Sequence, residues 1–166
     1  MTGNLQAAIR QTRPFASLEA EAFLNLQRSA DHLMRGVAAL LKGAELSPAQ
    51  YNVLRILRGA GEAGLSCGEI GERMVTRDPD ITRLLDRLQR RGLTSRTRAR
   101  GDRRVVRVRL TEEGAALIKP LDGPVAALHR RQLGRLGARR LRTLIGLLEE
   151  TCREEPRKEN THDSHI

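Results

Sequence analysis

The 166-residue chain has few aromatic residues and few cysteines. Phe15, Phe23 and Tyr51 are its only aromatic residues, and a protein that binds single-stranded nucleic acid by stacking bases usually needs more aromatic surface than that. The two cysteines, Cys67 and Cys152, lie far apart in sequence, with neither a CxxC nor a Cys/His spacing. This pattern predicts neither a disulfide framework nor a zinc site, and we expect no metal and no other cofactor.

Long apolar runs and catalytic motifs are also missing. No stretch approaches the ~18 uninterrupted apolar residues of a membrane span, and the first residues lack the basic-then-apolar order of a secretory signal. No serine has a G-x-S-x-G setting, and there is neither a glycine-rich phosphate-binding loop nor an HExxH motif. The sequence therefore favours a cytoplasmic, non-enzymatic protein with no membrane contact.

Positive charge, by contrast, is abundant and unevenly placed. The formal net charge is +10, which favours a polyanionic partner. Residues 73–109 contain 13 arginines, no lysine and four aspartates, a net charge of +9, whereas the rest of the chain has a net charge of +1. Solvated charged faces usually mix the two signs. The segment 73–109 therefore indicates a contact with DNA rather than a device for solubility.

Apolar residues towards both ends of the chain predict long helices. From 17 to 42 they recur at alternating spacings of three and four, a heptad-like seam that suits lengthwise packing on another helix. That seam favours a dimer interface over a core helix inside a monomer. A helix expected after residue 111 should be bent or interrupted by Pro120 and Pro124, and a last amphipathic helix follows it. The residues expected at a homodimer interface are Phe23, Leu26, Leu33, Leu144 and Leu148.

Capping signals divide residues 47–91 into three shorter helices. SPAQ at 47–50 and SCGE at 66–69 are capping boxes. Asp78, as the cap, and Pro79, in the first turn, predict the start of the third helix. The apolar face of this third helix follows the i, i+3, i+4, i+7 pattern and consists of Ile81, Leu84, Leu85 and Leu88.

Beyond Gly92 the periodicity changes from helical to extended. Residues 94–100 are polar and tolerate a β-strand, and residues 104–110 alternate with a period of two. The Gly-Asp pair at 101–102 is a turn signal, so a two-stranded hairpin is expected. Two short capped helices, a third with an arginine-rich outer face and an arginine-rich hairpin follow one another in the order of a winged helix-turn-helix.

At this point the chain resembles the MarR family. The resemblance runs through LSPAQYNVLRILRGAG, GLSCGEIGERM, DPDITRLLDRLQRRGL and GDRRVVRVRLTEEG, and its most specific pieces are TRLLDRLxxxGL and DRRxxxxxLTxxG. It implies a mainly α fold: a winged helix-turn-helix with a small β-wing, flanked by N- and C-terminal dimerisation helices. It also implies a homodimer whose two winged domains bind the halves of a pseudo-palindromic DNA site.

The resemblance also assigns roles to individual residues. The start of the third helix matches the family's recognition helix, and Arg103 and Arg104 match the arginines of the wing, one of which typically enters the minor groove. Asp86 matches an acidic position that is expected to pair with an arginine near the wing. The residues expected to contact double-stranded DNA are Arg77, Pro79, Asp80, Thr82, Arg83, Arg87, Arg103 and Arg104.

The expected organisation has four parts. Residues 1–16 form a partly disordered N-terminal extension, and residues 153–166, which contain no core-forming residues, form a disordered tail. Residues 17–46 and 112–152 form a helical dimerisation region. Residues 47–111 form the winged helix-turn-helix domain.

The expected function is a sequence-specific transcriptional regulator, a repressor that covers promoter DNA and is released by an effector. The family often holds a pocket for phenolic or other lipophilic anions near the positions of His32, Tyr51 and His129, although ordinary packing or solvent contact is favoured for each residue singly. For Cys67, an incidental role is favoured over redox sensing. Two alternatives stay open: a sequence-tolerant architectural DNA-binding protein without an effector, and a protein–protein switch whose basic segment docks an acidic partner.

Overall fold

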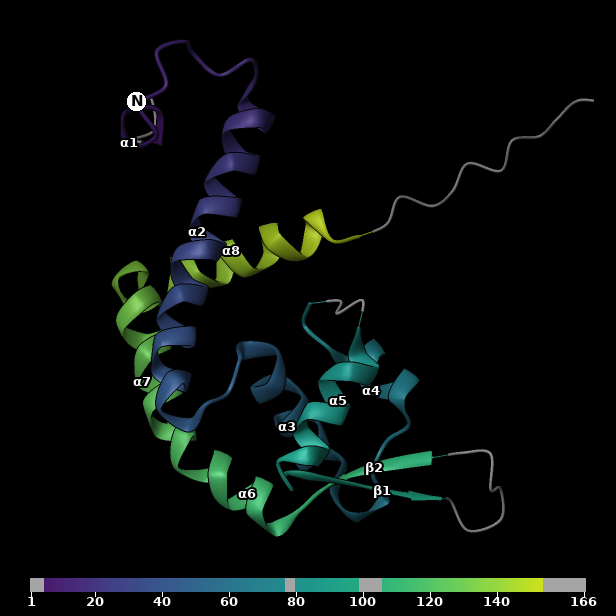
Figure 1. Ribbon diagram of the computed structural model, residues 1–166. Coiled ribbons are helices and arrows are strands. Elements are labelled where there is room, and N and C mark those ends of the chain that lie inside the picture. Colours follow the sequence, from purple (N-terminus) through teal and green to yellow (C-terminus); the bar gives the residue numbers. More distant parts are fainter. Residues whose placement is uncertain (1–4, 77–79, 99–105, 154–166) are drawn as a thin grey trace, which may run out of the picture. The chain divides into compact units, whose positions relative to one another are not determined.

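The computed structural model describes residues 5–76, 80–98 and 106–153. They form helices and one two-stranded antiparallel sheet (Figure 1), which confirms the expected mainly α fold with a small wing. The chain divides into two compact units, residues 1–128 and 129–166. The elements are α1 (Leu5–Ala8), α2 (Leu18–Leu41), η1 (Lys42–Ala44), α3 (Pro48–Ala60), η2 (Gly61–Ala63), α4 (Cys67–Arg73), α5 (Ile81–Arg90), β1 (Thr94–Arg98), β2 (Val106–Leu110), α6 (Glu112–Ile118), η3 (Lys119–Leu121), α7 (Asp122–Leu133), η4 (Gly134–Leu136) and α8 (Gly137–Thr151).

Capping side chains mark the starts of α2, α3 and α4. The Ser17 hydroxyl accepts the backbone N–H of Ala20 at the start of α2. Both predicted capping boxes, at 47–50 and 66–69, form with reciprocal hydrogen bonds at the starts of α3 and α4. Each cap satisfies backbone donors that a helix start leaves without a partner. Local sequence therefore sets where these helices begin.

The prediction that Asp78 caps α5 was wrong. Asp80, not Asp78, is the N-cap, and its carboxylate accepts the backbone N–H of Arg83 at 3.4 Å. The reason is geometric, because a capping side chain must reach the second or third helical N–H and α5 begins at Ile81. Asp78 and Pro79 themselves lie outside the described residues.

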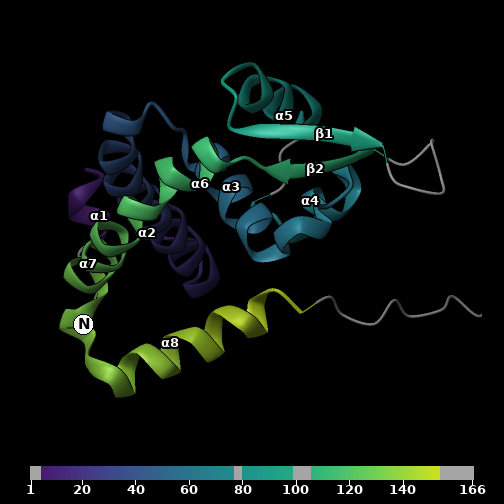
Figure 2. The same cartoon turned by 90° about the horizontal axis from the view of Figure 1, so that it is seen from below.

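The two predicted strands pair as a hairpin, and β2 has a further backbone neighbour that the sequence did not suggest. β1 and β2 pair antiparallel, with Thr94 opposite Leu110 and Arg98 opposite Val106. Val108 also exchanges two backbone hydrogen bonds with Leu65, of 2.7 and 3.0 Å, just before α4. Figure 2 shows the result: α5 lies along one side of the hairpin and α4 along the other.

The close approach of β2 to the segment before α4 requires a glycine. Gly64 has φ +62°, and a Cβ there would lie 2.6 Å from the carbonyl oxygen of Val108. Real Cβ atoms do not approach oxygen that closely, so a side chain at 64 would push β2 away from the segment before α4. The position of the hairpin against the helices therefore depends on this residue.

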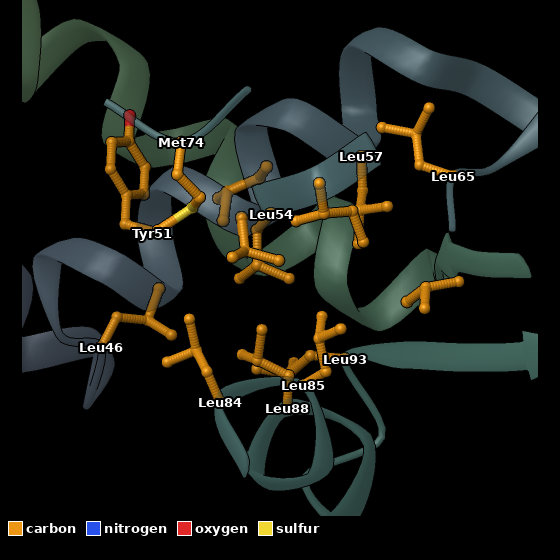
Figure 3. Packing of buried hydrophobic residues seen from close by; sticks show 14 of the residues in the cluster. Leu46, Tyr51, Leu54, Leu57, Leu65, Met74, Leu84, Leu85, Leu88 and Leu93 are labelled. Carbon is orange, nitrogen blue, oxygen red and sulfur yellow. The ribbon is translucent and has the colours of Figure 1, made fainter. Parts of the chain in front are cut away.

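The hydrophobic core of the first unit gathers under α5. Leu84, Leu85 and Leu88 turn inward from α5, as predicted, and Figure 3 shows them facing leucines of α3 and of the loops around it. Val108 is the buried residue of β2, whereas Val106 is 42% exposed, because it lies nearer the hairpin tip than the core reaches. With the leucine face of α5 buried, its opposite face is left to solvent.

The join between the hairpin and α6 is tight. The Thr111 hydroxyl donates to the carbonyl oxygen of Gly92 at 2.7 Å, and the Thr111 N–H donates to that of Leu93 at 3.2 Å. A Cβ on Gly114, in the first turn of α6, would lie 2.3 Å from the same Leu93 oxygen. The helical segment that follows is interrupted at Pro120, within η3, as predicted, whereas Pro124 is accommodated in the first turn of α7.

The described part of the second unit contains the end of α7, η4 and α8. Gly137 has φ +71° between η4 and α8, a conformation that glycine adopts without steric cost. No helix among residues 5–76, 80–98 and 106–153 is long and apolar enough to cross a membrane.

Candidate nucleic-acid interface

The outer face of α5 presents the predicted side chains to solvent. Thr82, Arg83 and Arg87 are exposed, and the Arg83 side chain is 77% exposed. A shallow hollow of about 680 Å³ runs along this face and is lined by Arg83, Asp86, Arg87, Gln89 and Arg90. An exposed helix of this width fits the major groove of DNA, where arginine can bond two acceptors of guanine.

Asp80 has two interactions with Arg83. Besides capping α5, its carboxylate lies 3.2 Å from Nε of Arg83, as an exposed ion pair three residues apart. An ion pair of this kind contributes a few tenths of a kcal/mol, about 0.2–0.5. Arg83 is therefore oriented by Asp80 only weakly, and its side chain stays largely exposed.

Asp86 pairs with an arginine of the wing, which confirms the expectation from the sequence. Its Oδ1 lies 2.6 Å from Nη1 of Arg96 in β1. The pair joins the first strand of the hairpin to α5. Asp86 therefore neutralises Arg96 and holds the hairpin beside the exposed face of α5.

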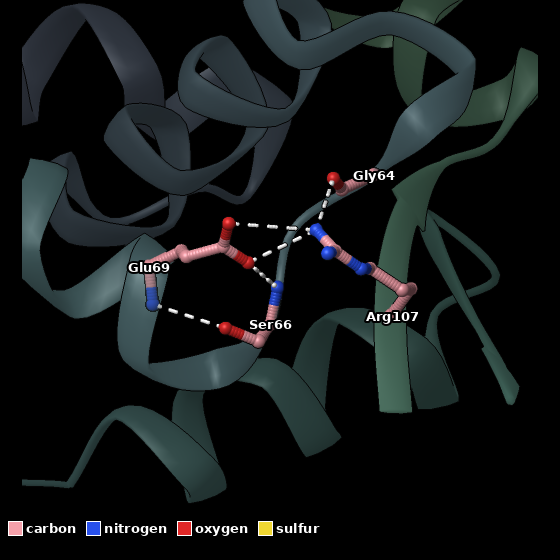
Figure 4. A network of polar contacts seen from close by, with 4 residues as sticks. All are labelled: Gly64, Ser66, Glu69 and Arg107. Atoms are coloured by element: carbon pink, nitrogen blue, oxygen red, sulfur yellow. Dashed lines mark hydrogen bonds and ion pairs between the residues drawn. The ribbon is translucent and has the colours of Figure 1, made fainter. Parts of the chain in front are cut away.

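A second polar network joins the other strand to α4 (Figure 4). Nη1 of Arg107 in β2 donates to the Gly64 carbonyl oxygen at 3.3 Å and lies 3.0 Å from Oε2 of Glu69. The same Glu69 oxygen accepts the backbone N–H of Ser66 at 2.7 Å. These hydrogen bonds from Ser66, and then the charge of Arg107, lower the pKa of Glu69. One carboxylate thus caps α4 and holds β2.

Several arginines of the basic segment therefore have folding roles that the sequence did not reveal. Arg96 and Arg107 brace the two strands. Arg91 donates to the carbonyl oxygens of Ala44 and Glu45 at the end of η1. The alternation of β2 could have suggested only that Arg107 and Val108 lie on opposite faces. Their partners come from tertiary contacts, so the charge of 73–109 is not all available to DNA.

Four of the predicted DNA contacts lie outside the described residues: Arg77, Pro79, Arg103 and Arg104. The described part of the hairpin ends at Arg98 and begins again at Val106. Of the eight predicted contacts, the structure brings Asp80, Thr82, Arg83 and Arg87 together along α5.

The predicted interface residues of the two long helices are largely exposed. On α2, Phe23 is 64% and Leu26 41% exposed, and Leu33 is half-buried. On α8, Leu148 is 38% exposed and Leu144 half-buried. Soluble proteins rarely leave such apolar rows in water. Each helix therefore has an apolar side that its own unit does not cover.

Tyr51 is buried and its hydroxyl has no hydrogen-bond partner among the described residues. Burial raises the pKa of this hydroxyl. The guanidinium carbon of Arg55 lies 5.9 Å from the ring centroid, and a bidentate pair between Arg58 and Asp122, with distances of 2.8 and 2.9 Å, lies nearby in the electrostatic environment of Tyr51. A buried hydroxyl without a hydrogen-bond partner lowers the stability of the fold. Packing alone therefore gives no reason for a hydroxyl at this position.

The remaining candidates from the sequence are two histidines and two cysteines. His32 and His129 are both exposed. Cys67 is half-buried, with its Sγ 4.0 Å from Oγ1 of Thr82, and Cys152 is exposed. Among the described residues, no group of three or more histidine, cysteine or acidic side chains could hold a metal ion.

Comparison with known proteins places this arrangement in a family. The model of the MarR family matches residues 46–106. A MarR transcription factor from Planctomyces limnophilus has a crystal structure that is 45% identical, with a TM-score of 0.63, over 82% of this chain and 99% of that one. The chain belongs to the MarR family. Its winged helix-turn-helix is the DNA-binding fold of that family.

Two further similar structures contain bound partners. A mutant of MarR from Escherichia coli, crystallised with operator DNA, is 27% identical over 83% of this chain and all of that one, with a TM-score of 0.73. NadR, crystallised with 4-hydroxyphenylacetate, is 26% identical over 86% of this chain and all of that one, with a TM-score of 0.67.

Curated relatives have names of the same kind. The transcriptional regulator TtmR from Methylorubrum extorquens is 36% identical over 106 residues, which are 64% of this MarR-family chain and 53% of TtmR. The chain thus spans about half the length of this relative.

Proposed function

We propose that this MarR-family protein is a sequence-specific transcriptional repressor that binds a pseudo-palindromic operator as a homodimer. The observation that carries the proposal is the outward row of Thr82, Arg83 and Arg87 on α5 above a buried leucine face. The relative crystallised with operator DNA supports it. The mechanism is steric: the dimer covers promoter DNA and so excludes RNA polymerase.

Capture of genomic DNA by the purified protein tests this proposal. Fragments bound from the organism's own genome are sequenced, and the recovered site is compared with random duplex of equal length. A specific regulator should bind its site about 10³-fold or more tightly than random DNA. Similar affinities for both would favour the architectural alternative. Weak binding that hardly responds to salt would favour an acidic protein partner instead, because phosphate contacts make DNA binding salt-dependent.

Dimerisation is assigned to residues 17–46 and 112–152. The support is the exposed apolar side of α2, with Phe23 and Leu26, and that of α8, with Leu148. Light scattering at micromolar concentration should give twice the chain mass. Phe23→Ser with Leu26→Ser should shift the protein towards monomer, whereas Arg28→Ser on the same helix should not. A wild-type protein that is monomeric at every concentration would remove the homodimer from the proposal.

An effector site is proposed around Tyr51 and Arg55. A phenolic carboxylate could accept a hydrogen bond from the orphaned Tyr51 hydroxyl and pair with the Arg55 guanidinium. The structurally similar NadR was crystallised with 4-hydroxyphenylacetate, which is a ligand of this kind, and so supports the proposal. Binding there is proposed to release the repressor from its operator.

The effector site is tested with Tyr51→Phe, which removes only the hydroxyl. Because that hydroxyl has no partner in the described residues, the variant should keep or gain stability, and it should bind operator as the wild type does. The concentration of 4-hydroxyphenylacetate that releases half of the operator should rise. Equal release curves for the two proteins would exclude Tyr51 from the effector site.

A further inference from the structure

A second arginine-rich segment lies outside the winged helix-turn-helix. Residues 123–148 contain six arginines and no aspartate or glutamate, a net charge of +6. The charge balance of the whole chain hides this segment, because acidic residues elsewhere offset it. All six side chains belong to exposed residues of α7, η4 and α8: Arg130, Arg131, Arg135, Arg139, Arg140 and Arg142.

Folding does not account for these arginines. Arg130 and Arg131 lie in the last turn of α7, where the helix dipole favours positive charge. Arg139 and Arg140 lie in the first turn of α8, where the dipole disfavours it, and that turn has neither a side-chain cap nor an acidic residue. None of the ion pairs formed by the described residues includes an arginine of 123–148. The positions of Arg139 and Arg140 are therefore unfavourable for the isolated chain.

Two of the three arginines of α8, Arg139 and Arg142, lie opposite its apolar side. At 3.6 residues per turn, Arg139 and Arg142 share one side with Gly146, whereas Leu141, Leu144 and Leu148 share the other. The apolar side can then pack in the proposed dimer while the arginine side stays in water. The two sides can serve different partners.

We infer that the exposed arginines of residues 130–142 bind the phosphate backbone of a second segment of double-stranded DNA, distinct from the operator contacted by α5. Arginine bonds phosphate oxygens bidentately, which suits a backbone of regularly spaced phosphates. Residues 123–148 contain no phenylalanine, tyrosine or tryptophan, so they lack the rings on which proteins usually stack single-stranded bases. An anionic membrane would also attract arginines, but an interfacial helix must bury its apolar side in lipid, and in the proposed dimer that side of α8 is already covered.

The inference rests on the proposed function and is tested beside it. The variant Arg139→Ala/Arg142→Ala is compared with Arg13→Ala/Arg28→Ala, which also removes two exposed arginines but from outside both basic segments. Operator binding is measured on a minimal duplex. The second contact is measured as capture of a labelled random duplex by protein already saturated with immobilised operator, at several salt concentrations, with dimer mass checked by light scattering.

The wild type and the Arg13/Arg28 variant should capture the second duplex with the same salt dependence. The Arg139/Arg142 variant should bind the minimal operator normally but capture less second duplex, with a log–log salt slope shallower by up to about 1.8, at about 0.9 for each phosphate that the protein no longer neutralises. Three results would overturn the inference: equal capture by both variants, weakened binding of the minimal operator, or a wild type that captures phosphatidylserine vesicles but no second duplex. Failure of the proposed function would appear separately, as equal affinities for operator and random DNA on the minimal duplex.

Discussion

Arg83→Ala separates DNA recognition from folding at the start of α5. Alanine keeps the backbone N–H that Asp80 caps and removes only the exposed ion pair with Asp80. That pair contributes about 0.2–0.5 kcal/mol, so the free energy of unfolding should fall by no more than about 0.5 kcal/mol. If Arg83 bonds a base, operator affinity should fall by about 1–3 kcal/mol, which is roughly 5- to 150-fold.

Two changes at Asp80 serve as controls. Asparagine caps helices as well as aspartate does, so Asp80→Asn should match Arg83→Ala in stability. Asp80→Ala removes the cap and should cost about 0.5–2 kcal/mol of unfolding free energy. Urea unfolding gives the stabilities, and fluorescence anisotropy gives the affinities for operator and for random duplex of equal length.

The outcome that contradicts base recognition is specific. An equal loss of affinity for operator and random DNA would make Arg83 a phosphate contact. A loss of stability as large as that of Asp80→Ala would make its side chain a structural element of α5. Unchanged operator affinity would remove it from the interface altogether.

Three further changes test the wing and the first unit. Replacing Arg103 and Arg104 with alanine should lower DNA affinity, most for operators with A·T-rich flanks, and leave the midpoint temperature of thermal unfolding nearly unchanged. A lower midpoint temperature together with normal DNA binding would contradict the wing contact. Arg107→Met should cost at most about 1 kcal/mol of unfolding free energy, because its ion pair with α4 is about one-third exposed. If Arg107 acts on DNA binding only by positioning the wing, Arg107→Met should not lower operator affinity further once Arg103 and Arg104 are alanine. Additive losses of operator affinity in the triple variant would refute that role. The hydrogen-bonded Arg58 guanidinium lowers the pKa of Asp122 in the folded protein. The ionised Asp122 carboxylate therefore stabilises the fold fully above the ordinary carboxyl pKa, and this stabilisation is lost as the pH falls through the lowered pKa of the folded protein. Urea unfolding should therefore show the stability difference between wild type and Asp122→Asn shrinking from roughly pH 5 to pH 2, and a constant difference would show that the charge of the carboxylate is not responsible.

The sequence predicted the features that are encoded locally. The capping boxes at 47–50 and 66–69 and the leucine face of α5 follow from neighbouring residues, and the structure confirms each of them. The cap of α5 was misplaced because both Asp78 and Asp80 can cap a helix and sequence alone does not fix the first helical residue. The hairpin was expected from its alternation, and the structure pairs the two predicted strands antiparallel.

Features that depend on distant partners could not be predicted in this way. Arg107 reads as one more positive charge in sequence, and only the fold places it beside Glu69, 38 residues away. The buried hydroxyl of Tyr51 likewise has meaning only once its surroundings are known. Pairing of Asp86 with the wing was the exception, because the family resemblance already implied it, and Arg96 is the partner that the structure supplies.

The close contact between the first turn of α6, at Gly114, and residues Gly92 and Leu93 determines which parts of the DNA-binding half move together. The start of α6 shares hydrogen bonds with Gly92 and Leu93, at the junction between α5 and the hairpin, and has no space for even a methyl group between them. A tilt of α6 must therefore carry the end of α5 and the base of the hairpin as one body. The first break in the helical backbone beyond this contact is η3, with Pro120. Because α5 and the hairpin precede that break, we expect a change in the direction of α6 to reorient the two elements together.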